Sequence, residues 1–168
     1  MEKPILTIVR RIKASPARVY AAWTKPELMA RWWGPDAGPV LSAEADPRVG
    51  GRFRVVFQTL DGETHDCRGE YREVEADRKL VFTWEWVTMP ERRSLVTLRL
   101  RPIEGGTELH FTHAQFFDEI ARDDHQAGWN SAFEKLDALV TELEAQQTDR
   151  CIGSNSTHSE PSSEPSAL

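Results

Sequence analysis

The chain has 168 residues, which suits one domain with a tail, and its formal net charge is −6. The acidic balance argues against nucleic acid or an anionic membrane as a partner, and no apolar run approaches the roughly 20 residues that span a bilayer. The N-terminus lacks a signal-peptide pattern and two cysteines cannot build a disulfide framework, so we expect a cytoplasmic protein.

The first part of the chain predicts one strand followed by two short helices. Residues 5–12 are rich in Ile, Leu, Val and Thr, which favours a strand. Ser15 and Thr24 are expected to cap the two helices, because each is followed within two residues by a proline that suits a first helical turn. The Gly-Pro pair at residues 34–35 is expected to end the second helix.

The middle of the chain predicts a series of antiparallel strands joined by hairpins. Phe53, Val55 and Phe57 alternate with other residues, which indicates a strand with one buried face. Gly69 is expected to form a bulge that bends its strand. Turns are predicted at residues 61–62, 77–79, 89–91 and 105–106, and further strands at residues 64–74, 80–86, 96–101 and 107–111.

A long amphipathic helix is predicted from about residue 118 to about residue 146. Asp118 suits its N-cap, and Gly128 indicates a close approach or a bend. Residues 147–168 are rich in Ser, Thr, Pro and Glu, and we expect them to form a disordered polar tail. Steps of three and four define one apolar stripe on the helix, formed by Trp129, Ala132, Phe133, Leu136, Leu139, Val140 and Leu143.

This order of elements and several motifs resemble one known superfamily. The matching segments are residues 15–24, 26–28, 31–35, 50–53, 69–71, 80–84 and 125–136, of which Trp32-Trp33-Gly34-Pro35 is the most specific. The chain resembles the START-like, or SRPBCC, superfamily, and within it the C-terminal domain of the activator of the heat-shock-protein-90 ATPase. The resemblance implies an α+β helix-grip fold over residues 1–146, in which a curved antiparallel sheet of six to seven strands wraps around the long helix.

The resemblance also implies a cavity between the sheet and the helix. Aromatic residues at strand and helix spacing usually pack in a core, so each candidate has that simpler interpretation as well. The predicted cavity residues are Trp33, Phe53, Phe57, Tyr71, Trp84, Trp86, Phe111, His113, Trp129 and Phe133.

The histidines match no metal-binding spacing, so we expect no metal and no cofactor. A lone histidine at position 113 is most often a hydrogen-bonded core residue. Asp123, Asp124 and His125 are expected on the solvated side of the helix. Trp32 and Trp33 suit either a contact patch or an anchor onto the sheet.

Three functions remain open from the sequence, and the ligand and the oligomeric state are not determined. The leading hypothesis is a noncatalytic protein that binds a small hydrophobic or aromatic molecule. The second is a chaperone-linked role in the stress response, with a heat-shock-90 ATPase as partner. Against it, we expect no additional N-terminal domain like that of the full co-chaperone, because four residues precede Ile5. The third is a cavity enzyme of the polyketide cyclase or aromatase type, for which His113, Tyr71 and His65 are the polar candidates.

Overall fold

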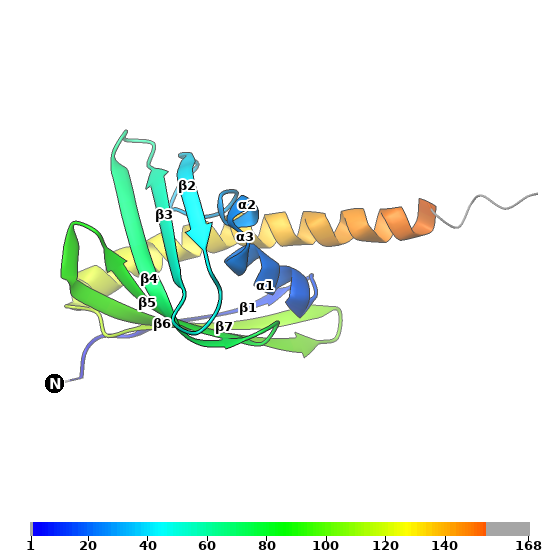
Figure 1. Cartoon of the computed structure of the whole chain (residues 1–168). Coiled ribbons are helices and arrows are strands. Elements are labelled where there is room, and N and C mark those ends of the chain that lie inside the picture. The colour runs from blue at the N-terminus through cyan, green and yellow to red at the C-terminus, as the bar shows by residue number, and fades with distance from the viewer. Residues whose placement is uncertain (1, 154–168) are drawn as a thin grey trace, which may run out of the picture.

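A seven-stranded antiparallel sheet bends around one long helix in the computed structural model, which describes the backbone of residues 2–153 and the side chains of residues 2–147 (Figure 1). The strands are β1 (Leu6–Ile12), β2 (Val40–Ala45), β3 (Arg52–Gln58), β4 (Thr64–Glu75), β5 (Lys79–Trp86), β6 (Met89–Ile103) and β7 (Gly106–Ala114). Their order in the sheet is β1-β7-β6-β5-β4-β3-β2, so the first strand pairs with the last. This confirms the α+β fold predicted from the sequence.

Two short helices follow the first strand, as predicted. They are α1 (Pro16–Thr24) and α2 (Pro26–Met29), and α2 ends at Met29, before the Gly-Pro pair at residues 34–35 that was predicted to end it. The Ser15 side chain caps α1 by accepting the backbone N–H of Arg18 at 3.3 Å. The predicted cap at Thr24 is wrong, because this residue ends α1 and its hydroxyl donates to the Tyr20 carbonyl oxygen.

The long helix α3 (Glu119–Gly153) begins where predicted and runs beyond the predicted end. The Asp118 carboxylate accepts the backbone N–H of Ala121 at 2.8 Å, which caps the first turn. Residues 147–152 contain neither Gly nor Pro, so nothing in the sequence stops the helix before Gly153. Of the predicted tail, residues 154–168 lie outside the described residues. None of the helices described here combines the length and the apolar character needed to cross a membrane.

Two features of the sheet differ from the sequence prediction. The turn expected at residues 89–91 lies at residues 87–88, and Pro90 is part of β6. The register between β5 and β6 shifts between Trp84 and Trp86, and a proline at such an irregularity removes no ladder hydrogen bond. Gly69 lies in a regular stretch of β4, and the register shift falls between Tyr71 and Glu73.

Gly69 serves a different purpose from the predicted bulge. A Cβ atom at this position would lie 1.8 Å from the Thr83 carbonyl oxygen on β5. The two strands approach so closely here that no side chain fits, which explains a glycine in a strand interior.

The core is built around the Trp23 indole of α1, which lies between the sheet and α3. Its side chain is 2% exposed, and aromatic rings from all layers surround it. Trp32 and Trp33 are both buried against this cluster, which agrees with anchors rather than with an exposed contact patch. The rings within 4.7 to 6.3 Å of the Trp23 ring, measured between centroids, belong to Trp32, Trp33, Phe82, Phe111, Trp129 and Phe133.

Candidate functional site

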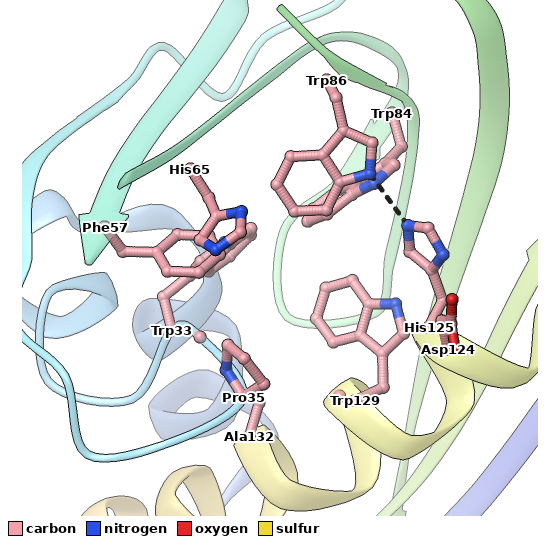
Figure 2. Close-up of a pocket in the computed structure, with 12 residues that line it drawn as sticks. Trp33, Pro35, Phe57, His65, Trp84, Trp86, Asp124, His125, Trp129 and Ala132 are labelled. Carbon is pink, nitrogen blue, oxygen red and sulfur yellow. Dashed lines mark hydrogen bonds between the residues drawn. The ribbon is translucent and has the colours of Figure 1, made fainter. Parts of the chain in front are cut away.

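A cavity of about 200 Å³ lies between the N-terminal part of α3, strands β3 to β5 and the loop after α2 (Figure 2). Its walls are mainly apolar and aromatic. It is therefore of the kind that binds small, largely apolar molecules. The lining residues are Trp33, Gly34, Pro35, Phe57, His65, Trp84, Trp86, Asp124, His125, Gly128, Trp129 and Ala132.

The periodicity of each element explains why these side chains converge. Trp84 and Trp86 are two residues apart on β5, so both point to the same face of the sheet. His125, Trp129 and Ala132 follow steps of four and three along α3, which places them on one face of the helix. The cavity forms where these two faces meet.

The tryptophan rings enclose the cavity at several angles. The Trp84 ring centroid lies 5.1 Å from that of Trp129, 5.5 Å from that of Trp86 and 5.8 Å from that of Trp33. The planes of Trp84 and Trp86 are nearly perpendicular, at 85°, and those of Trp33 and Trp129 make 72°. Such packing of tilted rings fixes the shape of the walls.

His125 joins α3 to β5 at the edge of the cavity. Its Nε2 atom accepts the indole N–H of Trp86 at 3.1 Å, the bond drawn dashed in Figure 2. Its Nδ1 atom lies 2.6 Å from the Ala121 carbonyl oxygen, so Nδ1 carries the proton and donates it there. Burial lowers the pKa of His125, although the Ala121 carbonyl and Asp124 oppose this effect, and the ring is neutral near pH 7.

His113 forms a second buried network behind the cavity wall. Its Nδ1 atom accepts the indole N–H of Trp129 at 3.0 Å, and its Nε2–H donates to the Ser94 hydroxyl at 2.6 Å. The Ser94 hydroxyl in turn donates to the Trp84 carbonyl oxygen. The residue is fully buried, and burial, followed by the nearby His125, lowers its pKa well below 6.5.

The structure places the ten predicted cavity residues in two groups. Trp33, Phe57, Trp84, Trp86 and Trp129 line the cavity. The other five, Phe53, Tyr71, Phe111, His113 and Phe133, are buried in the core and do not line it.

Sequence reasoning missed several residues that complete the cavity. His125 was expected on the solvated side of α3 but is half-buried, whereas Asp124 is exposed as expected and also borders the cavity; residues 34–35 were assigned only a role in ending a helix. The spacing of His125, four residues before Trp129, could have placed it on the buried face. Gly128 lines the cavity beside Pro35, but a Cβ atom there would lie 3.6 Å from Pro35 Cβ, an ordinary contact, so the predicted close approach is not what requires glycine at this position.

A lysine on α3 fastens the loop that forms one wall of the cavity. The Lys135 ammonium donates to the carbonyl oxygens of Asp36 at 2.6 Å and Trp33 at 3.4 Å. The Asp36 carboxylate also accepts the backbone N–H of Leu60, at 2.9 Å. Burial lowers the pKa of Lys135, and Asp36 opposes this effect. The loop is thus tied to both α3 and the β3–β4 hairpin.

Comparisons with solved structures agree with this fold. A protein from Chromobacterium violaceum is 27% identical, with a TM-score of 0.74 over 82% of this chain and 98% of that one. A protein from Rhodobacter sphaeroides is 29% identical, with a TM-score of 0.72 over 83% of this chain and 93% of that one. An AHSA1-like protein from Aeromonas hydrophila, 22% identical, shares the fold with a TM-score of 0.70 over 94% of this chain and all of that one.

The family comparison covers most of the folded chain. No curated protein matches the sequence. The model of the family described as Activator of Hsp90 ATPase homolog 1-like protein matches residues 13–141. That match contains both short helices, all the strands that border the cavity and the apolar stripe of α3 to Val140. The chain therefore belongs to the family of Activator of Hsp90 ATPase homolog 1-like proteins.

Proposed function

We propose that this protein binds a small, largely apolar organic molecule in the cavity between its sheet and α3. The observation that carries the proposal is the cavity itself, which has a volume of about 200 Å³ and is lined by four tryptophans and Phe57. An apolar cavity of about 150 Å³ is already large enough to bind benzene. The titratable residues along the lining are His65, Asp124 and His125, and this small polar set favours binding over turnover.

Of the three polar candidates for the enzyme alternative, His65 lines the cavity, whereas His113 and Tyr71 do not. His113 has both ring nitrogens engaged in hydrogen bonds and is fully buried. Tyr71 is 2% exposed, and burial raises the pKa of its hydroxyl far above 10. Neither group lines the cavity, so neither is placed to exchange a proton with an occupant.

A direct test uses benzyl alcohol as the probe and the indole N–H signals of the tryptophans as the NMR readout. We expect titration to shift the signals of Trp33, Trp84, Trp86 and Trp129. The Trp32 indole donates to the Ala22 carbonyl oxygen and does not line the cavity, so its signal should stay in place.

Substitution at Gly128 supplies a matched pair of variants for this test. A Cβ atom at this position makes only an ordinary contact with Pro35, so Gly128→Ala should still bind the probe. The longer side chain of Gly128→Leu should fill the cavity and abolish the shifts. Equal binding by the Leu variant, or no shift in the native protein, would contradict the proposal.

A chaperone-linked role is a second candidate, favoured by the description of the family. It predicts that the purified chain increases the ATPase rate of an Hsp90 protein and binds it directly. The Gly128→Leu variant separates the two functions, because filling the cavity should leave a surface contact with a chaperone intact. No stimulation and no binding by the native chain would remove this candidate.

A further inference from the structure

The aromatic walls of the cavity are suited to a positive charge. The face of an aromatic ring attracts a cation within about 6 Å of its centroid, and tryptophan does so best. Four tryptophans and Phe57 line this cavity, with centroid separations between neighbouring rings of 5.1 to 6.1 Å. A molecule held in so small a space is therefore close to several rings at once.

The charged residues on the lining itself point in the same direction; the Lys135 ammonium, 3.4 Å from the Trp33 carbonyl oxygen, is not among the lining residues. None of its twelve lining residues is Lys or Arg. Asp124 is exposed at the edge, and among the described side chains its carboxylate makes no hydrogen bond or ion pair, although it interacts electrostatically with His125. The Glu63 carboxylate lies 3.9 Å from His65 Nε2, which adds a second negative charge on the β3–β4 side.

His125 does not offset this negative charge. Its Nε2 atom is occupied as an acceptor of the Trp86 indole N–H, and its Nδ1–H donates to the helix backbone. A proton on Nε2 would face the indole N–H and break that bond. The ring therefore adds a dipole to the wall, and no positive charge.

From these observations we infer that the cavity selects a small organic cation, namely a quaternary ammonium or a protonated amine with apolar substituents. The inference rests on the proposed binding function and specifies its ligand class. The aromatic rings contact the apolar substituents and the charge, and Asp124 provides the counter-charge at the mouth. The volume of about 200 Å³ suits a free molecule of the size of choline.

Three probes of nearly the same shape test the charge preference. They are choline, its neutral carbon analogue dimethylbutanol, and the corresponding anion dimethylbutyrate. We expect choline to bind with a Kd at least about tenfold lower than dimethylbutanol, and dimethylbutyrate to bind most weakly. Shifts of the indole N–H signals of the lining tryptophans report binding, at low ionic strength because salt screens the exposed carboxylate.

Two aspartate variants identify the source of the preference. Asp124→Asn should raise the Kd of choline several-fold and leave that of dimethylbutanol unchanged. Asp123→Asn is the control, because this neighbour pairs with Arg122 at 3.0 Å and does not line the cavity. It should leave both constants unchanged.

The outcomes distinguish the two proposals. If dimethylbutanol or dimethylbutyrate binds as tightly as choline, the cation inference is overturned while the binding function stands. If benzyl alcohol and all three probes leave the indole signals unmoved, both proposals are overturned. A tenfold preference for choline that Asp124→Asn reduces and Asp123→Asn preserves supports both.

Discussion

His113 and His125 each accept one tryptophan indole N–H, and together they position two walls of the cavity. Each ring is neutral, with one nitrogen accepting and the other donating. A buried donor or acceptor that loses its partner costs about 1–3 kcal/mol. The positions of Trp86 and Trp129 therefore depend on the protonation of two imidazoles.

The partner of His113 can be removed without changing the histidine. Ser94→Ala leaves the buried Nε2–H of His113 without an acceptor, so the free energy of unfolding should fall by about 1–3 kcal/mol. Urea unfolding measures this change. Ser42→Ala on the exposed part of β2 is the control and should change stability by less than about 0.5 kcal/mol. Equal effects of the two substitutions would contradict the assigned network.

The buried histidines also predict how stability depends on pH. Burial lowers the pKa of both rings in the folded protein below the ordinary value of 6.5. As pH falls below 6.5 the unfolded chain takes up protons that the folded chain does not bind, so folding becomes less favourable. The stabilisation that comes from keeping both rings neutral is therefore complete above pH 6.5. It decreases as the pH falls toward the lowered pKa values of the folded protein.

Urea unfolding at about pH 7.5 and about pH 5.5 measures this loss. The His125→Gln variant keeps an oxygen to accept the Trp86 N–H but has no imidazole to protonate. Its free energy of unfolding should therefore decrease less between the two pH values than that of the native protein. The same decrease in both proteins would argue against His125 as a source of the pH dependence.

At the scale of the elements, the cavity depends on how α3, the loop at residues 33–36 and the β3–β4 hairpin are held together. Lys135 and Gly128 are both on the α3 side of this contact. The lysine supplies a charged donor to the loop carbonyls, and the glycine faces Pro35 of the loop with space for one further methyl group. Substitution of either residue should change the stability of the protein by a measurable amount.

Lys135→Met removes the donor and keeps most of the apolar stem. Hydrogen bonds from charged groups contribute about 1.5–3 kcal/mol, and partial exposure reduces this, so we expect a loss of about 1–2 kcal/mol in unfolding free energy. Amide hydrogen exchange should also become faster at residues 33–36 than elsewhere. Lys13→Met, at an exposed position at the end of β1, should change neither quantity. Unchanged exchange in the Lys135 variant would show that this contact does not hold the loop.

Gly128→Ala should stabilise the protein. Glycine in a helix interior costs about 0.5–1 kcal/mol relative to alanine, and the new methyl group meets Pro35 Cβ at an ordinary contact distance. We expect the melting temperature to rise by a few degrees. A lower melting temperature would mean that the loop at residues 33–36 packs against α3 more tightly than the distance of 3.6 Å indicates.

At the scale of the whole molecule, local patterns predicted most of the helices and strands, and the resemblance to a known superfamily implied how they are arranged. The alternation of Phe53, Val55 and Phe57 and the stripe on α3 each predicted the correct element, and successive hairpins predicted an antiparallel sheet. The start of β6 was misplaced, because Pro90 signals a turn locally, whereas the register shift beside Trp86 accommodates it in a strand.

The division of the aromatic residues between cavity and core could not be predicted in the same way. Phe53 and Phe57 occupy the same face of β3, but about 13 Å of strand separates them, and only Phe57 reaches the cavity. His125 lies at the cavity edge, where its ring accepts the indole N–H of Trp86, a residue 39 positions earlier in the chain. Contacts between distant elements decide such details, and periodicity within one element does not encode them.

The measurement that tests the central claim most directly is native mass spectrometry of the freshly purified protein, compared with spectra of the denatured chain. If the cavity binds a small molecule, the native protein should carry a discrete additional mass that is lost on denaturation. The same mass should be present in Gly128→Ala and absent from Gly128→Leu. A native mass equal to that of the bare chain, or an adduct that persists in Gly128→Leu, would contradict binding in this cavity.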